Sequence, residues 1–274
     1  MLCHHQSPAT ARQSEVPFNA DGTVLHLGVQ SGQISTRLIT VGQAERAIFL
    51  ARSLLSEVTV CTSPRHFTVC SGTYKGYLIS IVAIGMGYPN MDFFLREARA
   101  VTEGPMFVVR LGTCGSFDNE AAPIASIITP SKGIIQVSEQ FGMGPQFYKS
   151  LLPNPALTQK IIHNSMGIAV RETSHCSCDT FYFSQGKYSA DFEDDNAGLQ
   201  ELMRAKGVQT IDMETWYLFY LAAKCNSQRG PICAAAVAVP NANRVQKLFL
   251  TDAQEREACE LAAGRVCLEA LVQI

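Results

Sequence analysis

Short β-rich runs alternate with helical stretches from Arg37 to the end of the chain. Their hydrophobic periods predict strands at residues 37–41, 67–74, 77–84, 106–111, 127–129, 134–137, 168–174 and 232–239. Helices are predicted at residues 44–55, 92–102, 156–164, 195–206, 213–225 and 252–271. This alternation predicts an α/β fold: a single domain with a mixed, largely buried central β-sheet flanked by helices.

The limits of the pattern define the expected domain organisation. Residues 1–21 are polar and irregular, so we interpret them as a flexible N-terminal arm, and residues 22–274 form the one expected domain. Of the 274 residues, 47% are apolar and 17% are charged, which is enough to bury a substantial core. Lys75-Gly76 between two predicted strands indicates a hairpin.

Charge and hydropathy exclude several classes of partner. The net charge is −2 and the Lys and Arg residues are scattered, whereas a nucleic-acid binder would show a basic stripe. No apolar run approaches the roughly 20 residues that a membrane helix needs. The N-terminus also lacks the apolar core of a signal peptide. We therefore expect a cytoplasmic protein without a nucleic-acid or membrane partner.

The ten cysteines are irregularly spaced and form no CxxC pair, so buried reduced thiols are the favoured interpretation. Cys176 and Cys178 would share one face of a strand. A metal there would need two further ligands, and His175 is the nearest candidate. We expect no bound metal.

Two glycine-containing segments follow predicted strands, where α/β proteins place ligand sites. Gly42 opens a helix whose amides can face an anion, and Arg46 can return to the same anion, although such junctions are common. Gly85 and Gly87 let the backbone approach a ligand closely, or form a tight turn. Each segment alone is a weak signal.

A third segment places Arg110 at the end of an apolar strand, just before Gly112 and Thr113. A buried arginine is costly unless it meets an anion, which is either a ligand or a structural carboxylate. The Thr113 hydroxyl beside a turn favours phosphate as that ligand. A fourth segment, residues 179–187, combines Phe181 with Gln185 and a lysine, which suits the imide edge of a pyrimidine or a surface loop.

The order and spacing of these segments resemble the nucleoside phosphorylase-I family, and most of all its uridine phosphorylases. The resemblance covers nearly the whole chain. It runs through His26-Leu27-Gly28, Gly42…Glu45-Arg46, Arg65-His66-Phe67, Gly85-Met86-Gly87-x-Pro89, Arg110-x-Gly112-Thr113-x-Gly115, Asp179-Thr180-Phe181-Tyr182 and Asp212-Met213-Glu214.

The resemblance implies roles for individual residues. Phosphate would be held by Gly42, Arg46, Arg110 and Thr113, with Arg65 added from a neighbouring subunit. Ribose would be held by Met213, Glu214 and the neighbour's His26, and the base by Phe181, Gln185 and Lys187. The catalytic residues would be Arg110, Thr113, Gln185, Lys187 and Glu214. Alternatives remain for three of these residues: Glu214 as a carboxylate at a helix N-terminus, Met213 as core, and His26 as surface.

The chain departs from the family pattern at four positions. Gln43 stands where the phosphate segment usually has Asp, and Asn90 stands where the glycine loop usually has Ser. His66 replaces a glutamate that helps the bacterial enzymes bind an interfacial cation, so that ion is not carried over. Lys187 replaces the Arg of the usual Gln-x-Arg pair, which keeps the charge but loses the planar fork.

The resemblance implies phosphate-dependent cleavage of uridine, or of deoxyuridine or thymidine, to uracil and a pentose 1-phosphate. No cofactor is implied beyond phosphate as co-substrate, and the smallest active unit would be a homodimer, whether or not three dimers assemble. The alternatives are a purine nucleoside phosphorylase, a hydrolytic nucleosidase and a non-catalytic nucleoside-binding relative. Purine enzymes of the family use an Asp after the late strand, and residues 239–244 contain none. Three candidate phosphate arginines argue against hydrolysis.

Overall fold

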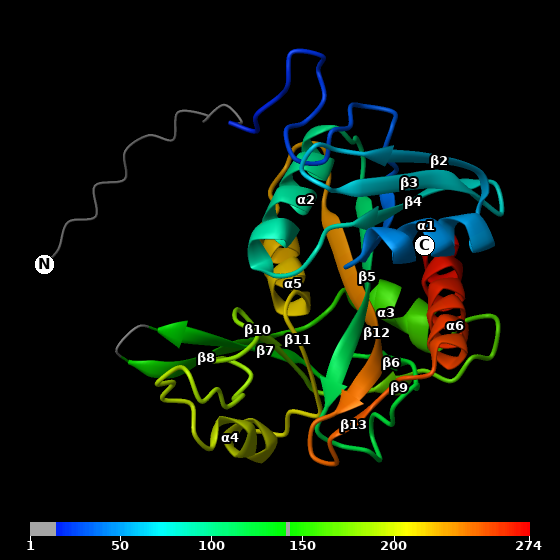
Figure 1. Ribbon diagram of the computed structural model, residues 1–274. Helices are drawn as coiled ribbons and strands as arrows, with labels where there is room; N and C mark the ends of the chain where they lie inside the picture. The colour runs from blue at the N-terminus through cyan, green and yellow to red at the C-terminus, as the bar shows by residue number, and fades with distance from the viewer. Residues whose placement is uncertain (1–14, 141–142) are drawn as a thin grey trace, which may run out of the picture.

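A mixed β-sheet runs through the centre of this computed structural model, which describes residues 15–140 and 143–274 (Figure 1). The first 14 residues of the expected N-terminal arm lie outside the described residues. Neighbouring strands follow the order β2-β3-β4-β1-β5-β11-β10-β7-β8, and β12 joins the sheet beside β5. The strands are β1 (Arg37–Val41), β2 (Ser56–Thr62), β3 (Thr68–Tyr74), β4 (Tyr77–Ala83), β5 (Met106–Ser116), β6 (Ile128–Thr129), β7 (Ile134–Gln140), β8 (Gly144–Leu151), β9 (Arg171–Glu172), β10 (His175–Cys178), β11 (Thr210–Asp212), β12 (Ile232–Asn243) and β13 (Leu248–Phe249).

The pairing confirms the expected mixed sheet. Strands β4, β1, β5 and β12 run parallel to their neighbours in the middle. Strand β11 is antiparallel to β5, and the β2–β3, β3–β4 and β7–β8 pairs are antiparallel too. The carboxyl ends of β1, β4 and β5 therefore meet at one edge of the sheet.

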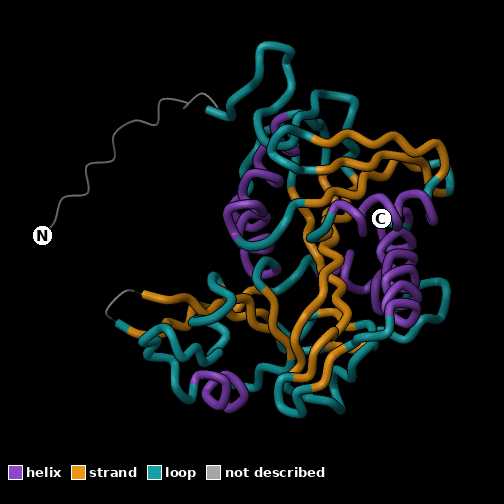
Figure 2. The backbone as a smooth tube through the Cα atoms, viewed as in Figure 1, coloured by secondary structure: helices purple, strands orange, loops and turns teal. Residues whose placement is uncertain are grey.

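Helices cover both faces of the sheet (Figure 2). One face carries α1 (Ala44–Leu54), α3 (Pro155–Ile162) and α6 (Ala253–Val272); the other carries α2 (Tyr88–Ala100) and α5 (Thr215–Lys224). Short α4 (Leu199–Ala205) packs against β10 and β11. Because successive strand residues point to opposite faces, Ile39 and Val109 enter the first core while Leu38 and Val108 enter the second. These buried layers confirm the predicted fold class.

The predicted hairpin is confirmed. Lys75 and Gly76 both have positive φ, 49° and 81°, as the two-residue turns that suit twisted strands require. Strand β5 is longer than predicted, because the glycines expected to form a turn pair with β12 instead, Gly112 with Ala238 and Gly115 with Ala242. The same pairing extends β12 to Asn243, so most of the expected loop at 239–244 is strand.

Two predicted elements are wrong in their limits. The strand expected at 168–174 is replaced by β9 and β10, because sheet pairing with β7 and β11 begins only at His175. Strand β10 is fully buried, although its sequence, His-Cys-Ser-Cys, does not show the apolar pattern of a buried strand. The helix expected at 195–206 shortens to α4. In contrast, α2 begins four residues earlier than expected, because Pro89 fits its first turn.

Strands β2, β8, β11 and β13 were not predicted. Residues of β2 are almost all exposed at the edge of the sheet, so no apolar alternation marks them. Strands β11 and β13 have only three and two residues, too few for a periodic pattern.

Candidate active site

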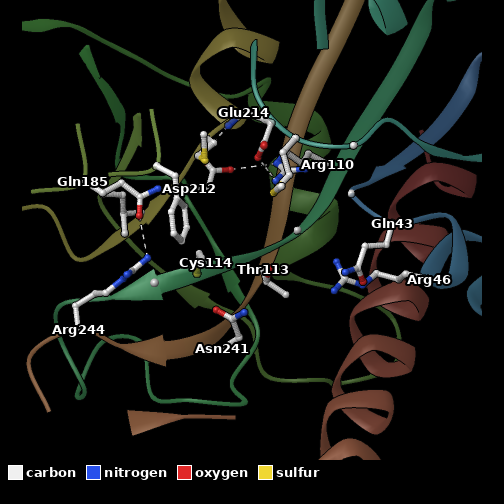
Figure 3. A pocket seen from close by; sticks show the side chains of 18 residues that line it. Gln43, Arg46, Arg110, Thr113, Cys114, Gln185, Asp212, Glu214, Asn241 and Arg244 are labelled. Atoms are coloured by element: carbon white, nitrogen blue, oxygen red, sulfur yellow. Dashed lines mark hydrogen bonds and ion pairs between the residues drawn. The ribbon is translucent and has the colours of Figure 1, made fainter. Parts of the chain in front are cut away.

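A cavity of about 390 Å³ opens where the carboxyl ends of β1, β4, β5 and β11 converge (Figure 3). This is the edge of the sheet at which α/β proteins bind ligands. Most of the predicted site residues line this cavity, namely Gly42, Arg46, Arg110, Thr113, Phe181, Gln185, Met213 and Glu214. Lys187, His26 and Arg65 do not.

The two glycine loops meet at one end of the cavity. The Gly85 amide donates to the Gly42 carbonyl at 2.9 Å, which ties the loop after β4 to the loop after β1. Gly85 and Gly87 have φ of 75° and 87°, values that a residue with a side chain rarely adopts. A Cβ on Gly42 would meet only the Gly85 carbonyl, at an ordinary 3.6 Å. The space in front of Gly42 therefore faces the cavity.

Arg46 reaches this end of the cavity from α1. Its Nε donates to Glu260 Oε1 on α6 at 2.8 Å, which fixes the guanidinium while the rest of the group borders the cavity. Gln43, where the family usually has Asp, is the N-cap residue of α1 but makes no side-chain capping bond. Its amide also lines the cavity, so this departure changes the lining and not the fold.

Arg110 is 5% exposed, lines the cavity and forms ion pairs with two buried carboxylates. Its Nε donates to Asp212 Oδ2 at 3.1 Å and its Nη2 donates to Glu214 Oε2. Nη1 has no hydrogen-bond partner among the described residues. Burial lowers the pKa of Arg110, but the charges of Glu214 and Asp212 outweigh burial and raise it. A fixed, permanently charged donor therefore borders the cavity.

Asp212 is a site residue whose role the sequence did not reveal. Burial alone would raise the pKa of its carboxyl, but His175, Arg110 and Ser177 outweigh burial and hold it well below its usual range. The carboxylate accepts from Ser177 Oγ at 2.5 Å and from the Thr215 amide at 3.3 Å. Asp212 therefore satisfies the first turn of α5 and anchors Arg110 at once.

Glu214 points away from the helix that it precedes. It is the N-cap residue of α5 but makes no side-chain capping bond. Its Oε1 accepts from the Gly87 amide at 2.7 Å, and its Oε2 accepts from Arg110. Burial raises the pKa of Glu214, the charge of Arg110 opposes this, and Asp212 adds to it. The helix-end role that was the alternative for Glu214 is therefore filled by Asp212, which accepts from the Thr215 amide.

The opposite end of the cavity is built by the segment after β10 and by Arg244, just beyond β12. Arg244 Nη2 donates to Gln185 Oε1 at 2.9 Å. A Cβ on Gly115 would lie 2.5 Å from Arg244 Nε, so this glycine leaves the space that the arginine occupies. Phe181 borders the same end and is 46% exposed. Arg244 was missed because it lies 59 residues from Gln185 in the sequence.

Lys187 approaches this end without lining the cavity. Its Nζ lies 2.7 Å from the centroid of the Phe181 ring. Burial, followed by the charge of Arg244, lowers the pKa of Lys187 to about 7. Lys187 lacks the planar fork of an arginine, and the guanidinium that contacts Gln185 is that of Arg244.

His26 and Arg65, the residues that the resemblance assigns to a neighbouring subunit, share another surface. The His26 ring stacks on Phe93 at 3.8 Å and meets the edge of Phe67, two residues after Arg65. His26 Nδ1 lies 2.5 Å from Glu97 Oε1. Arg65 is exposed in the turn between β2 and β3. The chain thus gathers both residues away from its own cavity.

The described residues offer neither a metal cluster nor a membrane-spanning helix. Within 15–140 and 143–274, no group of three or more His, Cys, Asp or Glu is arranged to hold a metal ion. The nine cysteines described are free, and Cys176 and Cys178 share a strand face with their Sγ atoms 3.8 Å apart. No helix in the described part of the chain is long and apolar enough to cross a membrane.

Comparison with known proteins bears on the class of this chain. The sequence profile of the phosphorylase superfamily matches residues 36–271. A DeoD-type purine nucleoside phosphorylase from Streptococcus pyogenes is 27% identical over 254 residues, covering 90% of this chain and 98% of that protein. The structure of a uridine phosphorylase from the oomycete Phytophthora capsici matches with a TM-score of 0.84 at 34% identity, over 94% of this chain and 97% of that one. A Trypanosoma brucei nucleoside phosphorylase described as showing uridine phosphorylase activity shares the fold, with a TM-score of 0.77 at 21% identity over 95% and 100%.

The chain belongs to the phosphorylase superfamily, and within it to the nucleoside phosphorylases, which are pentosyltransferases. Its relatives divide between purine and uridine enzymes.

Proposed function

We propose that this protein is a uridine phosphorylase, which converts uridine and inorganic phosphate to uracil and ribose 1-phosphate. The observation that carries the proposal is the Arg244–Gln185 pair, held at 2.9 Å beside Phe181 at one end of the cavity. Because Gln185 Oε1 already accepts from Arg244, the Gln185 side chain offers its Nε2 as a donor, and Arg244 offers the rest of its guanidinium. Donors suit a base that presents carbonyl oxygens and leaves as an anion.

Phosphate occupies the end of the cavity formed by Gly42, Arg46, Arg110 and Thr113. Arg110 offers Nη1, which has no partner among the described residues, and Arg46 is fixed by Glu260. Oriented there, a phosphate oxygen forms a bond to C1′ while the bond from C1′ to the base breaks. The electron pair of that bond leaves with the base, and the uracil anion then takes a proton from solvent.

Ribose lies between these ends, against Met213 and Glu214. A carboxylate accepts hydrogen bonds from the sugar hydroxyls and favours positive charge as it develops on the ring. Gly87 and Arg110 hold the Glu214 carboxylate in place before substrate arrives. Such preorganisation makes the group effective without rearrangement during the reaction.

A purine enzyme is the second candidate, because the DeoD-type relatives are purine nucleoside phosphorylases. Purine chemistry in this family needs an acid beside N7, at the base end. Among the described residues, the only carboxylates that line the cavity are Asp212 and Glu214. Both are ion-paired to Arg110, and the pKa of Asp212 is well below its usual range, which makes it a poor proton donor. Asn241 and Arg244 line the base end instead.

Phosphate is a co-substrate, and the step needs no cofactor or metal. The enzyme serves pyrimidine salvage in the cytoplasm. Lys187 supports the base end electrostatically, through Phe181 and beside Arg244.

The proposed active unit is a homodimer in which each chain lends His26 and Arg65 to the other's cavity. Their common surface, away from the chain's own cavity, suits an exchange across a two-fold axis. The test is complementation between Arg65→Ala and Arg110→Ala, each of which should be nearly inactive alone. Random pairing should restore about a quarter of wild-type activity, since half the dimers are mixed and each has one intact site. Heterodimers without activity would mean that Arg65 acts in its own chain.

The choice of base is tested with a nucleoside panel in saturating phosphate. Release of free base should be fastest from uridine, with deoxyuridine and thymidine as further pyrimidine substrates. Inosine and adenosine should be cleaved at least about a hundredfold more slowly, the scale set by an unpaired polar group in a site. Preferential cleavage of inosine or adenosine would instead identify a purine enzyme.

A further inference from the structure

A second cavity, of about 540 Å³, lies at the far ends of the two helices that reach the active cavity. Helix α2 starts beside Gly87 and α5 starts beside Glu214, and their last turns border the second cavity. The two helices pack against each other (Figure 1). The 13 residues of α2 span about 20 Å, so the cavities open at opposite ends of it.

The lining of this second cavity combines three kinds of group. Its cationic side chains are Arg96, Arg99, Lys224 and Arg229, and its apolar wall is Val16, Leu95, Leu221 and Ile232. Asn226 and Gln228 add side-chain amides. No Asp or Glu of the described residues lines it. A concave site with an apolar wall, convergent polar groups and one sign of charge suits a small anionic ligand.

Arg99 is a buried member of this cationic group. It is 7% exposed, and its Nη1 and Nη2 donate to the carbonyls of Gly104 and Thr102 at 2.7 and 2.5 Å. Its Nε has no hydrogen-bond partner among the described residues. No carboxylate of that part of the chain forms an ion pair with it. A buried guanidinium that meets only carbonyl oxygens keeps a charge that an anion would compensate.

The other cations differ in their pairing. Arg96 is bound to Asp92 at 2.8 Å, and Arg229 is bound to Glu103. Lys224 has no carboxylate partner in the described residues; its Nζ lies 5.6 Å from the Tyr220 ring centroid. Arg99 and Lys224 therefore supply the uncompensated positive charge of the cavity.

We infer that this second cavity binds a nucleoside monophosphate, with the phosphate on Arg99 and Lys224 and the heterocycle against the apolar wall. The Nη atoms of Arg99 are bound to carbonyls, so its guanidinium contributes mainly charge, which together with the Lys224 ammonium attracts a phosphate monoester. The amides of Asn226 and Gln228 can both donate to and accept from the edge of a heterocycle. The volume lies within the range of about 300–1,000 Å³ typical of small-molecule sites.

The test is calorimetric titration of the full chain with uridine 5′-monophosphate. Lys224→Glu is the chosen variant, because Lys224 is exposed whereas Arg99 closes the end of α2. It should weaken nucleotide binding about tenfold or more, the effect of losing one charged hydrogen bond. Lys206→Glu is the matched control, since Lys206 also ends a helix beside an aromatic ring, Phe147, but lies outside this cavity. It should leave binding unchanged.

Two further titrations locate the site and define its ligand. Arg46→Ala, which alters the active cavity, should bind the nucleotide as wild type does, and excess uridine without phosphate should not displace it. Inorganic phosphate, which under the proposed function also binds the active cavity, is added as a competitor of the bound nucleotide and should displace it at least about tenfold less well than the nucleotide itself. The inference fails if Lys224→Glu binds the nucleotide normally, if Arg46→Ala or uridine abolishes binding, or if phosphate displaces the nucleotide as well as the nucleotide displaces itself. None of these results depends on the base that the active site cleaves.

Discussion

The two ends of the active cavity, which we propose hold phosphate and the base and call the phosphate end and the base end, are built in different ways. At the phosphate end, Arg110 projects from a central strand and is fixed by two buried carboxylates, and Arg46 is fixed by Glu260. At the base end, Gln185 lies in the long segment between β10 and α4, and Phe181 beside it is 46% exposed. The first end is built on strand β5 and helix α1, whereas Gln185 and Phe181 at the second end lie on a loop.

Under the proposed function, the first end carries the phosphate chemistry that the family shares. The second end carries the choice of base, in which its members differ. A sheet edge tolerates few changes, because each strand residue is packed from both sides. A surface loop can change its side chains at small cost to stability. The departures follow this division in part: Arg46 and Arg110 are retained, whereas Lys187 stands where an Arg is usual and the guanidinium bound to Gln185 is that of Arg244.

The largest expected effect is that of Arg110→Ala. It removes a proposed phosphate donor and leaves Asp212 and Glu214 buried without the arginine that both contact. Turnover should fall at least about 100- to 1000-fold, and the free energy of unfolding should fall by about 3–5 kcal/mol. Steady-state kinetics and urea denaturation measure the two losses.

Arg46→Ala is the comparison for that variant. It should lose a similar amount of activity but less stability, because it leaves one carboxylate, Glu260, without its arginine, whereas Arg110→Ala leaves two. Equal loss of stability in both variants would contradict the special place of Arg110 in the sheet.

The next effect concerns the coupling of Gln185 and Arg244 at the base end. Each alanine variant should lower kcat/KM for uridine about 10- to 100-fold, the cost of one charged hydrogen bond. The double variant should be little worse than either single one, because the two groups act as a pair. KM for phosphate should stay unchanged. Multiplicative losses in the double-mutant cycle would show that the residues act separately.

A pair of glycine substitutions sharpens the contrast between the two ends. Gly115→Ala places a Cβ 2.5 Å from Arg244 Nε, and should lower kcat/KM for uridine about 10-fold or more by displacing that side chain. Gly42→Ala meets no close protein atom and should instead raise KM for phosphate. Both proteins should fold, as thermal melting would show. A phosphate defect in Gly115→Ala would break the assignment of the two ends.

The smallest effect is a pH dependence that depends on Lys187. Its pKa of about 7 means that its charge is present below pH 7 and is lost as the pH rises through that value. Activity towards uridine should therefore fall by about two- to tenfold over that interval, the scale of one partly screened charge. Lys187→Arg stays charged, so the ratio of wild type to this variant removes the titration of phosphate itself. A ratio independent of pH would exclude Lys187 from the base end.

The sequence predicted the phosphate end better than the base end, for a physical reason. Gly42, Arg46, Arg110 and Thr113 follow strands with clear apolar periods, so their convergence at one sheet edge could be expected. Asp212 ends a three-residue strand that carries no periodic signal. Arg244 reaches Gln185 only through the pairing of β5 with β12, which no local pattern reveals.

Strand β5 also shows that long-range pairing, which local sequence does not reveal, decides the structure. Residues 112–115 of β5 favour a turn by composition, yet they pair with β12. Gly112 and Gly115 have no side chains, which leaves room for two arginines. Cβ atoms at Gly112 and Gly115 would lie 2.9 Å and 2.5 Å from Arg110 and Arg244. These glycines are explained by neighbours across the site and not by their local conformation.

The central claim is that phosphate, and not water, attacks C1′ of uridine in this cavity. The most direct measurement is the yield of uracil and sugar from uridine with and without inorganic phosphate, in buffer free of phosphate. We predict one ribose 1-phosphate for each uracil when phosphate is present, and no uracil above the uncatalysed background when it is absent. Free ribose formed at the same rate in both cases would contradict the claim and identify a hydrolase.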